Sequence, residues 1–316
     1  MKEVPHISIV SPVYRAEKIL EKLVDEIRSA MIEINTTYEI ILVDDRSPDN
    51  SWEVMKQLSS KFSEVKCLRL SRNFGQHPTI MAGLSEAKGE WIVVMDCDLQ
   101  DQPKEIIRMY EKTKQGYDIV LASRKHRQDG VIKKFSSKLF YIIFNYLSGI
   151  EIDNEVANFG IYNQKVIQSI TKINDHIKFF PLFIKWVGFN STSIVVKHSE
   201  REDGKSSYSF FKLLSLSFNT IISFSDKPLK IFTFLGLSIS TISFVFGCYF
   251  LFQSLTGQIK EPGFSSLIIS IWLLSGIIIS TIGIVGIYLG KTFNQVKNRP
   301  IYIIDEKNEY KEIRVG

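Results

Sequence analysis

Residues 91–103 of the chain read Trp91-Ile92-Val93-Val94-Met95-Asp96-Cys97-Asp98-Leu99-Gln100-Asp101-Gln102-Pro103. The first half of this stretch is a short apolar, β-branched run of the kind that forms an interior parallel strand. The second half is polar, and Asp96 and Asp98 stand two residues apart in it. In extended backbone this spacing places both carboxylates on one side of the strand, about 6–7 Å apart along the chain, with Gln100 on that side again.

This polar segment has two interpretations. Two carboxylates and an amide oxygen are the hard ligands that Mg²⁺ or Mn²⁺ takes while it holds a substrate phosphate. The carboxyl end of a strand is also where an open α/β sheet binds its ligands. The alternative is a polar turn that ends the strand, with Asp101 or Gln102 starting a helix ahead of Pro103. The segment alone supports both interpretations equally.

Strands and helices alternate on both sides of this stretch. Further apolar strands are predicted at residues 7–10, 39–43, 65–70 and 119–123, with helical patterns between them. This alternation predicts an α/β fold with an open, mostly parallel sheet and helices on both faces. No Gly-x-Gly-x-x-Gly follows the first strand and no Walker lysine motif occurs, which disfavours dinucleotide binding and P-loop chemistry.

A second acidic strand end supports the metal interpretation. The strand at 39–43 runs directly into Asp44 and Asp45. Because parallel strands end at the same edge of a sheet, these acids would line one crevice together with Asp96 and Asp98. A crevice of bare carboxylates is costly unless a cation fills it. The whole chain therefore favours a site for Mg²⁺ or Mn²⁺ and a phosphate-bearing substrate.

The part of the chain after the sheet is basic and aromatic. Residues 135–147, with Lys134 and Lys138 at their start, fit either a helix in a bilayer interface or a core helix of the sheet domain. Residues 208–224 carry a second such pattern just ahead of a long apolar run, which favours the interface. Three widely spaced cysteines indicate no disulfide framework, and no nucleic-acid-binding module accompanies the net charge of +5.

Two long apolar runs predict membrane spans at about residues 231–255 and 264–289. No Asp, Glu, Lys or Arg occurs between Lys230 and Lys260, or between Glu261 and Lys291. Each run exceeds the roughly 20 residues that cross a hydrocarbon core, and neither holds the ionisable group that a transporter normally needs. Basic residues before the first run and after the second predict that both termini and the sheet domain are cytoplasmic.

Six motifs in order resemble the family 2 glycosyltransferases. The resemblance is to the enzymes that use polyprenyl phosphate, of the dolichol-phosphate mannose synthase and bactoprenol glucosyltransferase types. The motifs are SIVSPVY at 8–14, EIILVDDRSPD at 39–49, RNFGQ at 72–76, DCDLQDQP at 96–103, ASR at 122–124 and REDGKSSY at 201–208. They cover residues 7–230, and the apolar runs extend the match to about residue 290.

The resemblance implies a GT-A type sheet and roles for particular residues. Contacts to the donor fall to Pro12, Tyr14, Glu17, Val43, Asp44, Asp45, Asp96, Arg201 and Lys205. A divalent metal, Mg²⁺ or Mn²⁺, falls to Asp96, Asp98 and Gln100. Catalysis falls to Asp98 and Arg124, and the acceptor phosphate to Arg124, Lys134 and Lys138. Ala16 stands where the family usually has an acid, which leaves Glu17 as the neighbouring carboxylate.

The implied enzyme is a membrane-anchored, inverting hexosyltransferase. It would move a sugar from a nucleoside diphosphate sugar, with UDP favoured, to polyprenyl (undecaprenyl) phosphate on the cytoplasmic face. Two alternatives stay open, namely transfer onto a lipid-linked saccharide in surface polysaccharide assembly and a non-catalytic membrane scaffold that binds nucleotide sugars. No nucleic-acid partner is expected, and glycines in the apolar runs would permit a homo-oligomer.

The domain organisation expected from these features is that of a multi-pass protein of the cell inner (cytoplasmic) membrane. Its parts are a cytoplasmic catalytic domain at residues 1–207, an interfacial helix and linker at 208–230, a two-helix transmembrane region at 231–290 and a cytoplasmic tail at 291–316. One strand is predicted in the tail, at residues 301–304.

Overall fold

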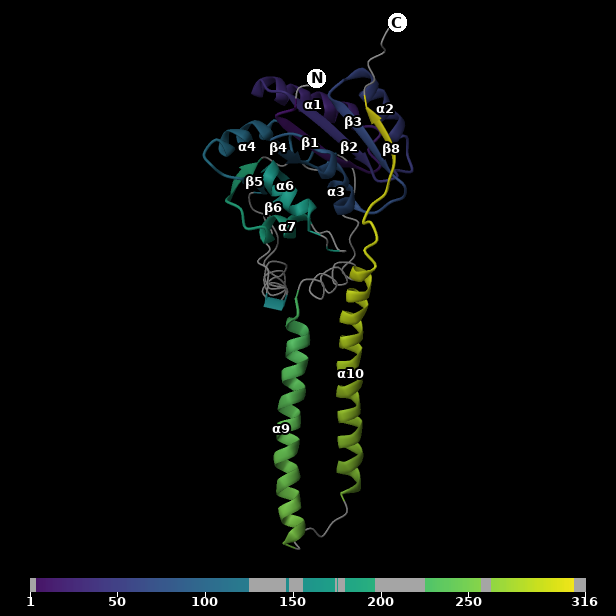
Figure 1. Cartoon of the computed structure of the whole chain (residues 1–316), viewed down its shortest axis with the longest axis vertical. Helices are drawn as coiled ribbons and strands as arrows, with labels where there is room; N and C mark the ends of the chain where they lie inside the picture. The colour runs from purple at the N-terminus through teal and green to yellow at the C-terminus, as the bar shows by residue number, and fades with distance from the viewer. Residues whose placement is uncertain are drawn as a thin grey trace, which may run out of the picture. The chain divides into compact units, whose positions relative to one another are not determined.

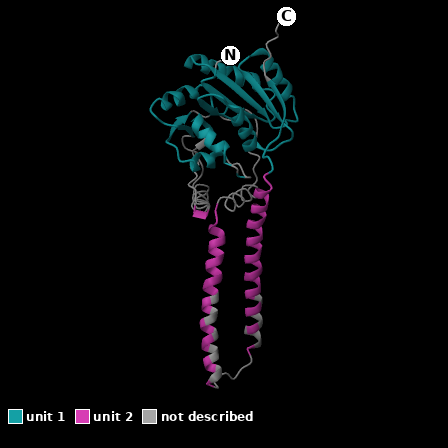
Figure 2. Cartoon of the chain, viewed as in Figure 1, with its two compact units in different colours: residues 1–130, 152–206, 299–316 teal, residues 131–151, 207–298 magenta. Residues whose placement is uncertain are grey.

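A computed structural model describes residues 4–124, 146–147, 156–173, 175, 180–196, 225–256 and 263–309 of the chain (Figure 1). The chain divides into two compact units (Figure 2). The first contains residues 1–130, 152–206 and 299–316, and the second contains residues 131–151 and 207–298. The C-terminal residues therefore return to the unit that holds the N-terminus.

The first unit is built on a mixed, mostly parallel sheet. Its eight strands run in the order β7-β5-β6-β4-β1-β2-β3-β8. Six strands point the same way, whereas β6 and β8 are antiparallel to their neighbours. The strands are β1 Ile7–Val13, β2 Tyr38–Asp44, β3 Val65–Leu70, β4 Trp91–Val94, β5 Ile119–Arg124, β6 Val156–Asn163, β7 Ser191–Val196 and β8 Ile304–Glu309. The predicted open, mostly parallel α/β sheet is confirmed.

Helices cover both faces of this sheet. On one face α1 contacts both α2 and α4, and these helices cover a core that includes Ile9 of β1. On the other face α3 packs against β1 and β2, where Gly83 lies so close to Val10 that a Cβ would stand 2.4 Å from Val10 Cγ1. The helices of the unit are α1 Leu20–Ile34, α2 Ser51–Lys61, α3 Gln76–Glu86, α4 Glu105–Thr113, α6 Gln164–Thr171 and α7 Phe180–Trp186.

The C-terminal strand β8 lies further along the chain than its sequence indicated. The prediction placed a strand at 301–304, whereas β8 covers Ile304–Glu309 and pairs antiparallel with β3 as an edge strand. Residues 305–309 are charged or polar, so they lack the apolar pattern of an interior strand. The strand is instead held by backbone pairing and by side-chain ion pairs, including Arg69 with Glu306.

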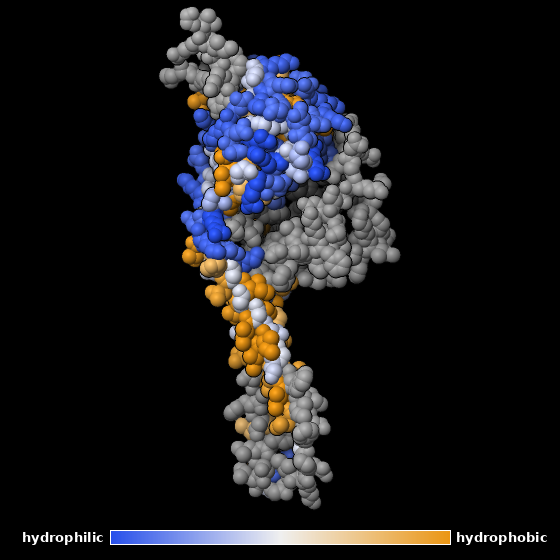
Figure 3. Space-filling view, turned by 90° about the vertical axis from the view of Figure 1, so that its right-hand side faces the viewer, coloured by the Kyte–Doolittle hydropathy of each residue, from blue (hydrophilic) through white to orange (hydrophobic). Residues whose placement is uncertain are grey.

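The second unit contains two long helices, α9 Lys227–Leu255 of 29 residues and α10 Phe264–Val296 of 33 residues. The hydroxyl of Tyr288 on α10 donates to the carbonyl of Ser225, just before α9, at 2.7 Å. Within the described part of the chain, one stretch, Leu273–Val296, is long and apolar enough to cross a membrane. Figure 3 shows apolar side chains on the surface of the long helices. Two membrane spans therefore stay a prediction.

The two predicted interfacial helices are outside what the structure describes. The segment at 208–224 has no described residue, and in the segment at 135–147 only Tyr146 and Leu147 are described, as helix.

Candidate active site

The polar segments after β1, β2 and β4 meet at one edge of the sheet. These strands are parallel neighbours, with Val13 of β1 opposite Asp44 of β2 and Val10 opposite Val94 of β4. Backbone hydrogen bonds extend the alignment beyond the strands, because the N–H of Asp45 donates to the carbonyl of Val13 at 3.0 Å. The predicted meeting of the two acidic strand ends is therefore observed in the register.

The segment after β4 presents oxygen ligands at this edge. The side chains of Asp96, Asp98 and Gln100 are all half-buried. An oxygen of Asp96 accepts a hydrogen bond from the amide of Gln76 at 2.7 Å, and an oxygen of Asp98 accepts one from the N–H of Gln100 at 3.2 Å. Asp98 also borders a cavity of about 490 Å³ between α1 and the β4–α4 connection. Its surroundings are therefore open enough for a ligand.

This donor set fits a divalent cation that is completed by its substrate. Mg²⁺ is commonly bound through one or two carboxylates together with substrate phosphates rather than by a full protein cage. Asp96, Asp98 and Gln100 supply two carboxylates and an amide oxygen, which are hard ligands of this type. Among the described residues, no group of three or more His, Cys, Asp or Glu side chains forms a complete metal site. Asp96, Asp98 and Gln100 therefore fit the protein's share of such a site.

Cys97 stands between the two acids and has a structural place. It packs against the hydrophobic core, and burial raises the pKa of its thiol to about 12. The strand β4 ends at Val94, one residue before its predicted end at Met95, and residues 97–98 form a turn, so the extended backbone predicted across Asp96 and Asp98 is not observed. Leu99, two residues after Cys97, has a left-handed φ of 55° and lies in the bend that follows this turn.

Asp44, the last residue of β2, is a fully buried carboxylate. One oxygen accepts the N–H of Ser47 at 2.9 Å, and the other lies 3.3 Å from Nε of Arg69 on β3. Burial raises the pKa of Asp44, while the hydrogen bond from Ser47 and the charge of Arg69 act in the opposite direction. The sequence did not identify Arg69 as part of the site, because its role depends on its position beside Asp44 in the β2–β3 register.

Asp45 points to a different partner from Asp44. Its two oxygens accept the N–H groups of Phe74 and Gly75 at 2.7 and 2.9 Å. Burial raises the pKa of Asp45, and these two backbone hydrogen bonds oppose the rise. Asp45 thus fixes the RNFGQ loop, whose last residue, Gln76, bonds Asp96. The sequence offered this loop as a motif without assigning it a role.

The end of β1 contributes an exposed ring and a set of backbone contacts. Pro12 is buried, whereas Tyr14 is 44% exposed and precedes Arg15, which has a left-handed φ of 56°. The N–H of Arg15 donates to the hydroxyl of Ser47 at 3.2 Å. Tyr14 and Arg15 are therefore the accessible side chains directly after this strand.

Glu17 and Val43 have surroundings of their own. The carboxylate of Glu17 accepts the N–H of Asn50 at 3.0 Å and thereby ties the β1–α1 connection to the start of α2. Val43 is fully buried within β2. In the structure Glu17 contacts the start of α2 and Val43 lies in the core. The contacts of both residues with the donor stay predictions.

The predicted basic residues are only partly within the described chain. Arg124 is the last residue of β5, whose carboxyl end lies at the same edge as β4 with β6 between them. The side chain of Arg124 and the residues Lys134, Lys138, Arg201 and Lys205 lie outside the described residues. Their roles at the acceptor and at the donor phosphates stay predictions.

Comparison with known proteins identifies the class to which this fold and this acidic edge belong. Residues 8–173 match the family described as Glycosyl transferase family 2. The chain belongs to the family 2 glycosyltransferases and is a glycosyltransferase.

Particular relatives match over almost the whole chain. The chain is 32% identical to an uncharacterized glycosyltransferase of Synechocystis sp., over 95% of both chains. It is 32% identical to a bactoprenol glucosyl transferase of Shigella phage SfII, over 96% of this chain and 98% of that one. It is 30% identical to an undecaprenyl-phosphate 4-deoxy-4-formamido-L-arabinose transferase of Shewanella sediminis, over 96% and 93%.

A solved structure resembles the chain more distantly. Glucosyl-3-phosphoglycerate synthase from Mycobacterium tuberculosis, in complex with Mg²⁺ and uridine diphosphate, is 13% identical with a TM-score of 0.49. The similarity covers 69% of this chain and 78% of that one.

Proposed function

We propose that this glycosyltransferase moves a sugar from a nucleoside diphosphate sugar, with UDP favoured, to polyprenyl phosphate at the cytoplasmic face of a membrane. The observation that carries the proposal is the meeting of Asp44, Asp96 and Asp98 at one sheet edge. The names of two relatives that align over more than nine-tenths of both chains support a polyprenyl phosphate acceptor. Transfer onto a lipid-linked saccharide would use the same edge and differs in the acceptor.

In the proposed mechanism the edge divides its work between the nucleoside and the diphosphate. Asp44, whose carboxylate is fully buried, would support the loop at the nucleoside side of the site through its bond from Ser47, and the exposed ring of Tyr14 would lie beside the base. Asp96, Asp98 and Gln100 would hold Mg²⁺ or Mn²⁺, which when bound offsets the negative charge of the diphosphate. Gln76 orients Asp96 through its 2.7 Å hydrogen bond. Asp44 and Asp96 are held by contacts within the protein before the substrate arrives, which favours stabilisation of developing charge.

The transfer step itself needs little from the protein as a base. A phosphate oxygen of the lipid attacks the anomeric carbon of the sugar, and the bond from that carbon to the nucleoside diphosphate breaks with inversion. The nucleophile is already ionised near neutral pH, so no strong general base is required. Arg124, at the carboxyl end of β5, is proposed to stabilise the charges of the reacting phosphates.

The proposed membrane anchor consists of α9 and α10. Both helices are longer than the roughly 20 residues that span a hydrocarbon core. The basic residues in the first turn of α9 and near the end of α10 favour both termini in the cytoplasm. This arrangement would bring a lipid-bound phosphate and a soluble sugar nucleotide to the same compartment.

The test compares Asp98→Asn with Asp25→Asn, a matched change on the exposed face of α1. Membranes containing each variant receive Mg²⁺, undecaprenyl phosphate and one of a panel of radiolabelled UDP- and GDP-sugars, and labelled lipid is measured. We expect the wild type and Asp25→Asn to label the lipid phosphate and Asp98→Asn to lose activity by about 100-fold or more, as for loss of a key electrostatic group. Equal amounts of each variant in the membrane fraction control for folding and insertion.

Two results would contradict the proposal. Normal metal-dependent turnover by Asp98→Asn would remove the acidic edge from the mechanism. Labelling only of lipid-linked saccharides, with none of bare undecaprenyl phosphate, would replace the proposed acceptor by the alternative one.

A further inference from the structure

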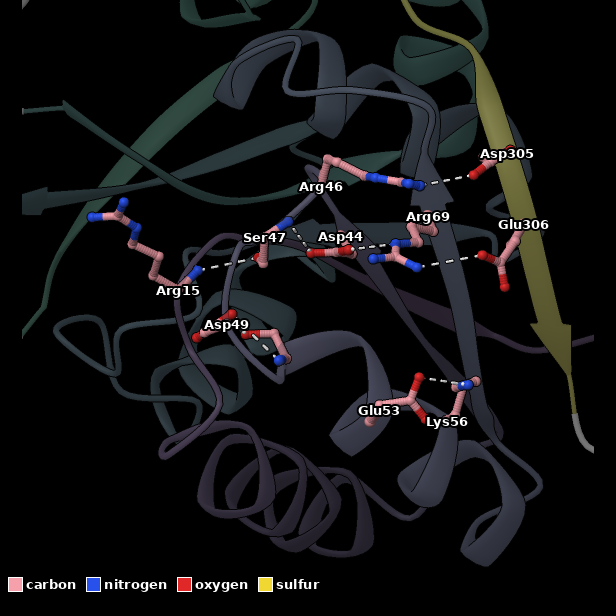
Figure 4. Close-up of polar contacts among 11 residues, drawn as sticks. Arg15, Asp44, Arg46, Ser47, Asp49, Glu53, Lys56, Arg69, Asp305 and Glu306 are labelled. Atoms are coloured by element: carbon pink, nitrogen blue, oxygen red, sulfur yellow. Dashed lines mark hydrogen bonds and ion pairs between the residues drawn. The ribbon is translucent and has the colours of Figure 1, made fainter.

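The edge strand β8 places two carboxylates against arginines of the proposed donor site (Figure 4). Glu306 lies 3.4 Å from Nη1 of Arg69, whose Nε lies 3.3 Å from Asp44. Asp305 lies 2.8 Å from Nη1 of Arg46. In the sheet register Asp44, Arg69 and Glu306 stand directly opposite one another on β2, β3 and β8. An acid, a base and an acid therefore form one row across three strands.

The buried carboxylate in this row depends on Arg69. Removing the partner of a buried charge strongly destabilises the protein, because the remaining charge is neither solvated by water nor compensated. Among the described residues, the Asp44 oxygen near Arg69 accepts no hydrogen bond and Nε of Arg69 donates none. The two groups therefore form an ion pair without a hydrogen bond to fix its geometry. The position of the guanidinium must then be set from its other side. Glu306 and the ring of Trp52, 5.5 Å from the guanidinium carbon, are the contacts there.

The second β8 contact acts on the loop that bonds Asp44. Arg46 has a left-handed φ of 55° and directly precedes Ser47, whose N–H donates to Asp44. Asp305 holds the side chain of Arg46. The two acids of β8 thus reach both protein contacts of Asp44, namely the cation beside one oxygen and the loop that hydrogen-bonds the other.

We propose that Glu306 and Asp305 are positioning residues for nucleotide binding, and that β8 completes the donor site through Arg69 and Arg46. The inference rests on the proposed function, in which Asp44 supports the loop at the nucleoside side of the donor site. It adds a part of the chain that lies beyond α10, separated from it by residues 297–303, to the machinery of the sheet edge. It also gives β8 a role besides covering the open edge of the sheet.

The chain offers a matched control for that second role. Lys307, next to Glu306 on β8, pairs with Glu86 of α3 at 2.7 Å. Glu86→Gln therefore breaks an ion pair that fastens β8, just as Glu306→Gln does, but it leaves Asp44, Arg69 and Arg46 untouched. If β8 only covers the edge, the two substitutions should act alike.

The experiment uses the full chain in detergent with Mg²⁺. Binding of UDP, with GDP as a second probe, is measured by titration calorimetry, and donor KM and kcat are measured with the best sugar nucleotide. We expect Glu306→Gln to weaken nucleotide binding about two- to fivefold, the range of a partly exposed ion pair, and to raise donor KM with kcat nearly constant. Glu306→Gln combined with Asp305→Asn should weaken it about tenfold, as two such pairs acting together.

Arg69 variants provide the second readout. Arg69→Gln should weaken nucleotide binding more than Glu306→Gln, whereas Arg69→Lys should keep the charge and recover part of the affinity. Glu86→Gln should leave the affinity within error of the wild type while lowering the unfolding temperature about as much as Glu306→Gln.

The outcomes separate the two proposals. Suppose that the wild type binds UDP or GDP, and that Glu306→Gln and Glu86→Gln either both keep this affinity or both lose it to the same extent. This result overturns the role of β8 and leaves the proposed function standing. A loss in kcat with unchanged donor KM also overturns the role of β8. A wild type that binds neither nucleotide overturns the proposed function, and this inference with it.

Discussion

Asp45 ties the RNFGQ loop to the sheet, and we predict that Asp45→Ala destabilises the protein and weakens donor binding. The carboxylate oxygens accept the N–H groups of Phe74 and Gly75 at 2.7 and 2.9 Å. Gly75 has a φ of 94°, a conformation that residues with side chains rarely adopt, and α3 starts directly after it. Gln76, the first residue of α3, donates to Asp96. Loss of the carboxylate therefore leaves two N–H groups without their acceptor and releases the residue that orients Asp96.

The expected loss follows from two opposing contributions. A hydrogen bond to a charged group is worth about 1.5–3 kcal/mol, so the two bonds together represent about 3–6 kcal/mol. The side chain of Asp45 is buried, and burial raises its pKa, which means that desolvation already offsets part of this gain. We therefore expect a net loss of about 2 kcal/mol in the free energy of unfolding. For a domain of about 150–250 residues this lowers the unfolding temperature by about 4–8 °C.

The assay is thermal unfolding of the detergent-solubilised chain at neutral pH, followed by tryptophan fluorescence, with donor KM measured in parallel. Gln76→Ala serves as the comparison, because it removes the hydrogen bond to Asp96 and leaves Asp45 in place. It should raise donor KM with little change in unfolding temperature. An unfolding temperature for Asp45→Ala within 1 °C of the wild type, together with an unchanged donor KM, would refute the reasoning.

Three further predictions concern stability, pH and thiol reactivity. Glu39→Ala removes a buried carboxylate that pairs with Lys66 at 2.6 Å near the amino end of β2, and should cost about 3–5 kcal/mol in unfolding measurements while leaving donor KM of the folded enzyme unchanged. Burial raises the pKa of Asp44, so donor affinity measured by titration should increase as the pH rises through that pKa and stay constant above it. The charge of Arg69 lowers this pKa, so Arg69→Gln should move the increase in affinity to higher pH. A donor affinity that does not change with pH would contradict the role of Asp44. Burial raises the pKa of Cys97 to about 12, so alkylation followed by mass spectrometry at pH 8 should find it unmodified in the folded protein, and rapid labelling would show that it is accessible.

Five of the interior strands could be predicted from the sequence because most of their residues are apolar. β1, β2, β3, β4 and β5 correspond to runs that the alternation of strands and helices identified. The strands that were missed or misplaced lie where composition carries less information. β7, at one edge of the sheet, has the polar sequence STSIVV, and β8, at the other edge, is charged. β6 inserts antiparallel between β4 and β5, a pairing that depends on contacts distant in the sequence.

Only part of the candidate site could be predicted from the sequence, namely its acidic residues. The spacing of Asp96 and Asp98, and the acids after β2, were sufficient to place an acidic edge, because parallel strands end together. Gln76 and Arg69 were not assigned a role, since each acts through a residue on another element. Gln76 reaches Asp96 from the start of α3, and Arg69 reaches Asp44 across the β2–β3 register. Contacts of this kind become visible only when the register and the loop conformation are known.

The predicted cation at the acidic edge has narrower support in the structure than in the sequence. From the sequence, the acids at the ends of β2 and β4 were expected to form one crevice of bare carboxylates. In the structure both oxygens of Asp45 accept hydrogen bonds from backbone N–H groups. Asp44 accepts a hydrogen bond from Ser47 and forms an ion pair with Arg69. The charge after β2 is therefore compensated within the protein, so the electrostatic case for a divalent metal rests on Asp96 and Asp98 alone. Two acids that are adjacent in the sequence thus have two separate roles. Asp44 lies at the nucleoside side of the proposed donor site, whereas Asp45 holds the loop whose residue Gln76 orients Asp96 at the proposed metal site.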